Sequence, residues 1–153
     1  MEELVDIAKA LADRTRLRLL AACLDGELCA CQLIALVGLP NSTVSGHLNT
    51  LKRAGLLSAR REGRWMHYRL TPEAERSPAA NDAAAMVRAA AEREPQLRDD
   101  QRSMKAILKL EPEELCRMQR EDPGCCFSAP QTRAAARSQR VGRGRSTATG
   151  SKR

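Results

Sequence analysis

Apolar residues recur at helical spacing through the first part of the chain. One set occupies the i, i+3, i+4 and i+7 positions of a one-sided helix and consists of Leu4, Ile7, Ala8 and Leu11. A second set follows Asp13, a favoured N-cap residue, and consists of Leu17, Leu20, Ala21 and Leu24. The pattern predicts two packed amphipathic helices.

Two further helical patterns follow in close succession. Residues 30–37 are mostly apolar and end at Gly38, which predicts a short helix. Residues 41–53 have an apolar face made of Val44, Leu48 and Leu51, and the opposite arc is small, polar or basic. A short helix, a tight turn and a second helix with a polar outer face form the helix-turn-helix arrangement, whose second helix enters the major groove of DNA.

The next segment predicts a β-hairpin. Residues 56–59 and 65–70 are the two short strands, and the basic turn 60–64 joins them. A hairpin directly after a helix-turn-helix is a wing. The fold class predicted by these elements is mainly α with a small β-hairpin wing, that is, a winged helix-turn-helix.

Three helices are predicted beyond Pro72, at residues 80–93, 96–110 and 112–119. Within one chain they have nothing large to bury against, and the alanine run permits close helix–helix approach. We therefore expect a two-fold homodimer formed through the terminal helices. The predicted parts are a DNA-binding and dimerisation domain at 1–95, a helical extension with a cysteine-rich end at 96–127 and a disordered basic tail at 128–153.

Charge is distributed unevenly along the 153 residues. The net charge of +7 comes entirely from the tail, because seven basic and no acidic residues follow position 127, and the other nineteen basic residues equal the nineteen acidic ones. Such a tail is expected to be solvated, although it adds sequence-independent attraction to phosphates. Neither a long apolar run nor a signal peptide is found, so we expect a cytoplasmic protein without a membrane partner.

The candidate functional residues are six cysteines: Cys23, Cys29, Cys31, Cys116, Cys125 and Cys126. In a reducing compartment a disulfide framework is not expected, so clustered cysteines indicate metal or redox sites, whereas the lone Cys23 is typical of a core residue. Cys29 and Cys31 are expected in the first turn of the helix at 30–37. The positive end of a helix lowers a thiol pKa, and thiolate is the form that binds soft ions.

Side chains two positions apart do not share a face of an α-helix. A single ion bound to both Cys29 and Cys31 is therefore expected to unwind that first turn. Because this helix precedes the predicted recognition helix, such a distortion would change how a dimer fits its DNA half-sites.

Five segments resemble the arsenic-sensing repressors of the ArsR/SmtB family, over roughly residues 2 to 110. They are 13–20 (DRTRLRLL), 27–33 (ELCACQL), 42–48 (STVSGHL), 54–57 (AGLL) and 63–70 (GRWMHYRL). The resemblance implies a homodimeric repressor that binds double-stranded operator DNA of an arsenic-resistance operon and dissociates when trivalent arsenic or antimony binds cysteine thiolates. It implies no catalytic cofactor and no enzymatic activity.

Trivalent arsenic in this family usually takes three thiolates. Some family members have a third cysteine three residues after the second, but this chain has Ile34 there. The remaining candidates are Cys116, Cys125 and Cys126. Three roles are open for them. They complete the site, from the same or the other subunit; they form a separate site; or they have no role beyond oxidation.

The predicted DNA contacts lie on the second helix and the wing. Short polar side chains suit base edges and phosphates: Asn41, Ser42, Thr43, Ser45 and Asn49. Basic side chains suit phosphates: Lys52, Arg53, Arg60, Arg61 and Arg64. His47 borders the apolar face, so it either packs inside or contacts DNA.

Other functions fit less well. A cadmium, lead or zinc sensor of the same fold, or a thiol redox sensor, would bind and release DNA in the same way but respond to a different signal. Zinc sensors of this fold commonly have histidines on the dimer helix, but no histidine follows His67 here. Cadmium sensors often have N-terminal cysteines, but no cysteine precedes Cys23. A thiol enzyme lacks a Cys-x-x-Cys helix start and a His and Asp partner set. A DNA-packaging protein would depend on residues 128–153.

Overall fold

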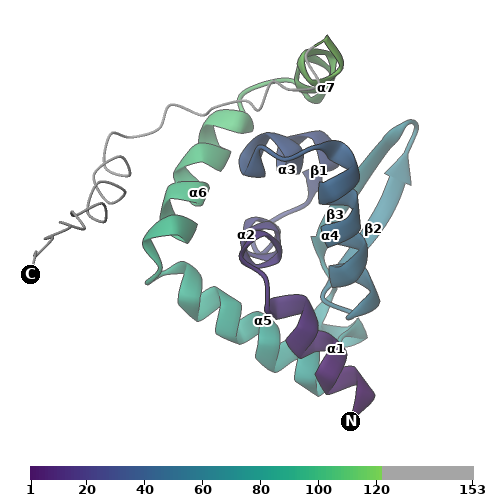
Figure 1. Ribbon diagram of the computed structural model, residues 1–153, viewed down its shortest axis with the longest axis vertical. Helices are drawn as coiled ribbons and strands as arrows, with labels where there is room; N and C mark the ends of the chain where they lie inside the picture. The colour runs from purple at the N-terminus through teal and green to yellow at the C-terminus, as the bar shows by residue number, and fades with distance from the viewer. Residues whose placement is uncertain (122–153) are drawn as a thin grey trace, which may run out of the picture.

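Seven α-helices and a three-stranded sheet form the part of the chain that the computed structural model describes, residues 1–121 (Figure 1). In chain order the elements are α1 (Glu2–Leu11), α2 (Arg14–Ala22), β1 (Leu28–Cys29), α3 (Ala30–Val37), α4 (Asn41–Arg53), β2 (Leu57–Glu62), β3 (Trp65–Leu70), the 3₁₀ turn η1 (Glu73–Glu75), α5 (Pro78–Ala91), α6 (Pro95–Ile107) and α7 (Pro112–Glu121). Cys125, Cys126 and the tail at 128–153 lie outside the described residues. Within the described residues, no helix combines the length and apolar character that crossing a membrane requires.

Helix α2 lies at the centre of the fold. Figure 1 shows it nearly end-on, with α1, α3, α4, α5 and α6 around it. Its Leu19 and Leu20 are fully buried and join a core to which α3 and α4 contribute Leu33, Leu48 and Leu51. The helix-turn-helix formed by α3 and α4 is thus held on a leucine-rich core.

Asp13 starts α2 as predicted. Its Oδ1 accepts a hydrogen bond from the Arg16 N–H at 2.9 Å, and this bond lowers the pKa of the carboxyl below its ordinary value. Arg16 in turn donates to the carbonyls of Lys9 and Ala10. The N-cap therefore also fixes how α1 joins α2.

Replacing Asp13 with alanine is expected to lower the free energy of unfolding by about 1 kcal/mol, because the N-cap acceptor is lost. The lowered pKa means that the charge-dependent part of this contribution is complete above about pH 4 and is lost as the pH falls through the folded-state pKa. Urea unfolding at several pH values measures both effects. Asp13→Asn is the matched control, since it keeps the acceptor but should lose the pH dependence; equal losses in both variants would contradict the capping role.

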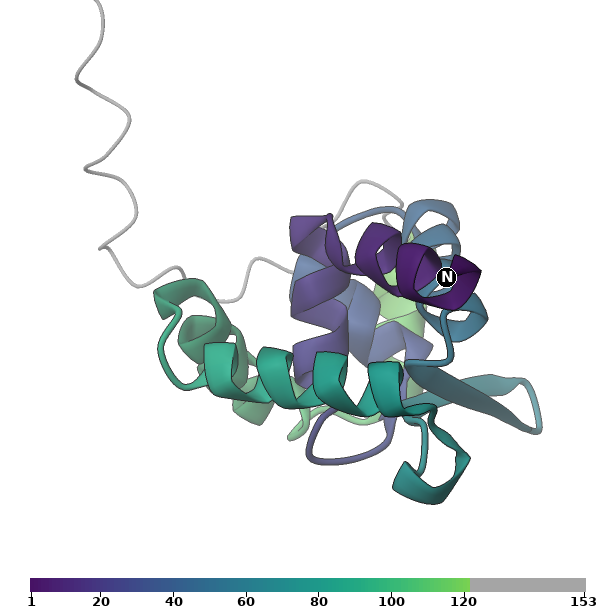
Figure 2. The same ribbon diagram turned by 90° about the horizontal axis from the view of Figure 1, so that it is seen from below.

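The sheet contains a strand that the sequence pattern did not predict. Strand order is β1-β3-β2, all antiparallel, with Leu28 opposite Tyr68 and Cys29 opposite His67. The predicted hairpin is confirmed as β2 and β3, but β2 continues to Glu62, so Arg60 and Arg61 lie in the strand and only Gly63 and Arg64 form the turn. Gly63 has φ +58°, a value that favours glycine. Figure 2 shows the hairpin projecting from the body, away from α6.

The late helices do find partners within the chain, so that expectation was wrong. Helix α6 packs on α2 and α3, and α7 packs on α3. Their buried apolar side chains are Leu97, Met104, Ile107 and Leu115. Arg18 of α2 donates to both carboxylate oxygens of Asp100, at 2.7 and 2.9 Å, and Asp100 is only 6% exposed. The described part of the extension, up to the end of α7, is therefore part of the folded core.

Helices α1 and α5 leave apolar side chains in solvent. Ile7 and Ala10 are buried, whereas Ala8 and Leu4, which were expected to face inward, are exposed, as are Val5 and Met86. The predicted helix at 80–93 is confirmed as α5, with Ala83, Ala84 and Val87 buried against the same chain.

Candidate cysteine site and DNA-reading surface

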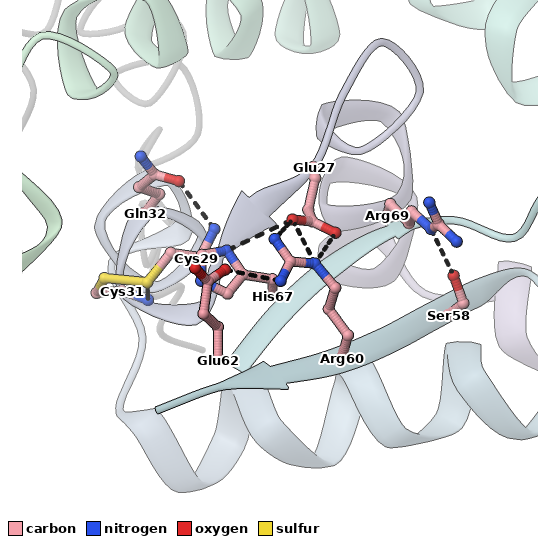
Figure 3. Close-up of polar contacts among 9 residues, drawn as sticks. All are labelled: Glu27, Cys29, Cys31, Gln32, Ser58, Arg60, Glu62, His67 and Arg69. Carbon is pink, nitrogen blue, oxygen red and sulfur yellow. Dashed lines mark hydrogen bonds and ion pairs between the residues drawn. A yellow bond between two sulfur atoms is a disulfide. The ribbon is translucent and has the colours of Figure 1, made fainter. Parts of the chain in front are cut away.

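Cys29 and Cys31 meet at the junction between β1 and α3. Cys29 is the last residue of β1 and the N-cap of α3, with extended backbone (φ −71°, ψ 149°), whereas Cys31 lies in the first helical turn. The Gln32 Oε1 accepts a hydrogen bond from the Cys29 N–H at 2.8 Å, and the Cys31 N–H donates to the Cys29 Sγ at 3.4 Å (Figure 3). With this reciprocal capping, the Cys29 and Cys31 side chains point toward each other.

The two sulfurs are joined in a disulfide, with their Cα atoms 5.4 Å apart. This corrects two expectations. The two sulfurs are joined rather than free, and Cys29 precedes α3 as its N-cap instead of lying in the first turn of the helix. The expectation that one ion bound to both sulfurs unwinds that turn stays a prediction.

The pair lies inside the protein, with Cys29 and Cys31 each 2% exposed. Helix α7 packs on α3, and the Gln119 Nε2 donates to the Cys31 carbonyl oxygen at 2.9 Å. Leu115 of α7 is 1% exposed and belongs to the core. The C-terminal extension is thus bonded directly to the backbone of the cysteine site.

Cys116 is a free thiol on α7 and is half-buried. It lies one helical turn before Gln119, and residues three apart share a helix face, so it is on the side of α7 that packs toward α3. Burial raises the pKa of this thiol, and the charges of Arg120 and Arg64 oppose that rise. In the described range, however, no three His, Cys, Asp or Glu side chains are grouped closely enough to hold one metal ion.

Cys23 behaves as a core residue, as predicted. It is 1% exposed, and burial raises the pKa of its thiol to about 12. Such a thiol is almost fully protonated at neutral pH, and a protonated thiol is a poor metal ligand. The described chain therefore has three distinct cysteine environments: the joined pair, the half-buried Cys116 and the inert Cys23.

A polar cluster lies beside Cys29 on the same face of the sheet (Figure 3). The Arg60 Nε donates to both Glu27 carboxylate oxygens at 2.9 Å, and its Nη1 donates to the Glu62 Oε2 at 2.7 Å. The hydrogen bonds from Arg60 hold the pKa of Glu27 below its ordinary value. His67 lies between these groups, with its Nδ1 3.8 Å from the Glu27 Oε1. Arg60, predicted as a phosphate contact, is thus already paired with two carboxylates.

Helix α4 presents the predicted polar face. Val44, Leu48 and Leu51 are buried, as expected. The exposed side chains are Asn41, Ser42, Thr43, Asn49, Lys52 and Arg53. Ser45 is half-buried, and its Oγ donates to the Asn41 Oδ1 at 3.2 Å. A row of short polar groups that ends in two cations therefore faces solvent, as base and phosphate contacts require.

His47 and the remaining wing arginines lie in different surroundings. His47 packs against the start of α2, with its Nδ1 3.5 Å from the Arg16 Nη1 and 3.9 Å from the Asp13 Oδ1, which favours the packing role over a DNA contact. Arg61 and Arg64 are exposed near the hairpin turn, and Arg64 lies over the Trp65 ring at 5.2 Å. Arg61 donates to the Gly63 carbonyl.

Sequence reasoning missed three residues at the cysteine site. Gln32 follows Cys29 at the spacing of a capping box, and this signal was available. Glu27 and Gln119 had no such signal, because their partners Arg60 and Cys31 are 33 and 88 positions away in the sequence.

The fold and the helix-turn-helix match known regulators. The sequence model described as the bacterial regulatory protein, arsR family, matches residues 13–59. The arsenic resistance transcriptional regulator ArsR1 of Pseudomonas putida is 46% identical over 68 residues, which cover 44% of this chain and 53% of that protein. This chain thus spans about half the length of that relative.

Two further likenesses cover more of the compared protein. An uncharacterised HTH-type transcriptional regulator of Methanocaldococcus jannaschii is 43% identical over 68 residues, which make up 44% of this chain and 76% of that protein. The solution structure of a homodimeric winged helix-turn-helix DNA-binding domain from Mycobacterium bovis, a possible ArsR-family transcriptional regulator, is 30% identical, with a TM-score of 0.51 over 61% of this chain and 82% of that one. On these matches and on its winged helix-turn-helix fold, the chain belongs to the ArsR family of bacterial regulatory proteins.

Proposed function

We propose that this protein is a transcriptional repressor that binds operator DNA of an arsenic-resistance operon and releases it when trivalent arsenic or antimony binds the thiolates of Cys29 and Cys31. The observation that carries the proposal is the position of these sulfurs: they lie together, at the N-terminus of the helix that precedes the recognition helix. The likeness to a regulator named for arsenic resistance supports arsenic as the ligand.

The chemistry requires the reduced pair. A cellular dithiol supplies two electrons and two protons and so converts the disulfide to two thiols. Arsenous acid, As(OH)₃, then exchanges one hydroxyl for each thiol; every exchange forms one As–S bond and releases one water, so arsenic keeps its oxidation state. Soft sulfur donors favour such an ion over magnesium or calcium.

A third sulfur completes the preferred coordination of trivalent arsenic. Cys116 is one source, because α7 already packs on α3 and Gln119 bonds to Cys31. Cys125 and Cys126 are the other sources and lie outside the described residues. No resident cofactor or catalytic role is part of this proposal, and the reducing cytoplasm is the compartment in which the thiols stay available.

DNA recognition is assigned to the polar face of α4 and to the exposed wing cations. Asn41, Ser42, Thr43, Ser45 and Asn49 read base edges or position the helix, and Lys52, Arg53, Arg61 and Arg64 contact phosphates. A homodimer brings two such faces to a two-fold operator. Exposed Leu4, Val5 and Met86 on α1 and α5 supply an apolar surface for that association.

A redox-responsive repressor is the second candidate, because the structure itself holds the Cys29–Cys31 disulfide. Two thiols give up two electrons and two protons to hydrogen peroxide, which is reduced to two molecules of water, and the two sulfurs form the disulfide. In that case the trigger is the disulfide, and arsenic has no role.

A gel-shift titration on the promoter upstream of the gene separates these functions. Protein is first reduced and freed of excess dithiol, then titrated in parallel with arsenite, antimonite, cadmium, zinc and peroxide. The proposal predicts release by arsenite and antimonite at concentrations where zinc has no effect. Release by peroxide with no response to arsenite would support the redox function instead of the arsenic function. Release by cadmium alone would support a cadmium sensor.

A further inference from the structure

We propose that the Glu27–Arg60 ion pair is the link through which the state of the Cys29–Cys31 pair sets the position of the wing, the β2–β3 hairpin. Glu27 and Arg60 are positioning residues here, since neither supplies a sulfur to the proposed site. The biological output of this link rests on the proposed function, but its test does not need arsenic.

The ion pair connects the cysteine segment to the far strand of the sheet. Glu27 lies two residues before Cys29, at the entrance to β1, whereas Arg60 lies on β2, the strand that does not pair with β1. The guanidinium donates through Nε and Nη2 to Glu27 and through Nη1 to Glu62. The planar Arg60 guanidinium has a defined orientation because carboxylates bond to it on two sides. A shift of Glu27 therefore moves Arg60 and, with it, β2.

The sheet register places the link directly beside the sulfur site. Cys29 is opposite His67, and His67 is opposite Arg60, so these three side chains share one face of the sheet in a row (Figure 3). The His67 Nδ1 and Nε2 lie 3.8 Å from Glu27 and 4.0 Å from Glu62. A change in the backbone at Cys29 therefore reaches the middle of the hairpin without passing through α4.

The segment before β1 borders an open cleft of about 510 Å³. Residues of this segment and of the sheet line the cleft: Cys23, Leu24, Gly26, Glu27, Arg60, Arg69 and Leu70. Bonds from Leu70 and Arg88 hold the start of the segment at Cys23, Leu24 and Asp25. Nearer Glu27, β1 pairs with β3 at only two positions, so few sheet hydrogen bonds oppose a displacement of Glu27.

The ion pair is better suited to coupling than to stability or DNA affinity. The Arg60 side chain is 52% exposed, and exposed pairs contribute little to folding. Two carboxylates bond to Arg60, so it offers less to a phosphate than Arg61, whose side chain lies on the opposite face of β2 and donates to the Gly63 carbonyl. Variants at Glu27 or Arg60 should consequently fold.

Hydrogen exchange of the full-length protein tests the link. Wild type, Glu27→Gln, Arg60→Gln and the matched control Arg61→Gln are compared with the cysteine pair reduced by dithiothreitol and oxidised by diamide. We expect amide exchange in residues 57–62 to differ by at least about threefold between the two states in wild type and Arg61→Gln, and to become nearly equal in Glu27→Gln and Arg60→Gln. Equal exchange in both wild-type states, or a wild-type response in Arg60→Gln, would overturn the proposal.

A gel shift then separates this link from the proposed function. In Glu27→Gln the arsenite concentration for half-release of DNA should rise about fivefold or more, while the amount of arsenic bound per chain stays at the wild-type value. An unchanged half-release concentration contradicts the link. If arsenite fails to release even wild type, while residues 57–62 still respond to the cysteine state, the arsenic function is wrong and the link stands.

Discussion

Replacing Cys29 with serine is expected to abolish the release of operator DNA by arsenite and to leave DNA affinity without arsenite within about twofold of wild type. Serine is a preferred N-cap residue, so its hydroxyl can accept from the Cys31 N–H in place of the Cys29 sulfur. The start of α3 is therefore retained, while one of the two paired sulfurs is lost. Fluorescence anisotropy of a labelled operator, with and without arsenite, measures both quantities.

Cys31→Ser should give the same loss of response. Cys23→Ala is the matched control, because Cys23 is also a buried cysteine but its thiol pKa is raised to about 12. Cys23→Ala is expected to keep the arsenite response. Release by arsenite from the Cys29→Ser complex, or its loss in Cys23→Ala alone, would remove the paired sulfurs from the switch.

Replacing Asp100 with alanine is expected to lower the free energy of unfolding by about 3 kcal/mol, the low end for a broken buried ion pair, because Arg18 is partly exposed. Asp100 accepts from Arg18 at two oxygens and from Gln96, and the same arginine donates to the Leu36 carbonyl at the end of α3. Loss of the Asp100 carboxylate leaves the Arg18 guanidinium without its charge partner. Urea denaturation measures the change.

The neighbouring Asp99 provides the matched control. It pairs with Arg102 on the exposed side of α6, with side chains 52% and 71% exposed. Asp99→Ala should change the free energy of unfolding by no more than about 0.5 kcal/mol. A double variant, Arg18→Met with Asp100→Leu, should recover much of the lost stability. Equal effects of Asp99→Ala and Asp100→Ala would show that the extension is not fixed by the buried pair.

The helix-turn-helix was predictable because its signals are local. Gly38 ends α3 in the left-handed conformation that its sequence position indicated, and the predicted bounds of α3 and α4 agree with the structure. The apolar face of α4 followed from the spacing of Val44, Leu48 and Leu51. Each of these inferences needs only residues within about four positions of one another.

The geometry of the cysteine site was not predictable in the same way. Strand β1 has two residues, too few for an alternating pattern, and its partner β3 lies about forty positions later. Without that strand, the sequence pattern predicts Cys29 in the helix and the two sulfurs on different faces. The pairing of Arg60 with Glu27 and the packing of α7 on α3 also depend on distant residues, which local patterns do not report.

Arsenic bound per chain is the most direct measure of the central claim, that the adjacent sulfurs at the start of α3 form the sensor. Full-length protein is equilibrated with arsenite after reduction or after oxidation by diamide, desalted and analysed by native mass spectrometry. The account predicts one arsenic per chain in the reduced protein and none in the oxidised protein. Equal arsenic binding in the two states, or none in either, would contradict it.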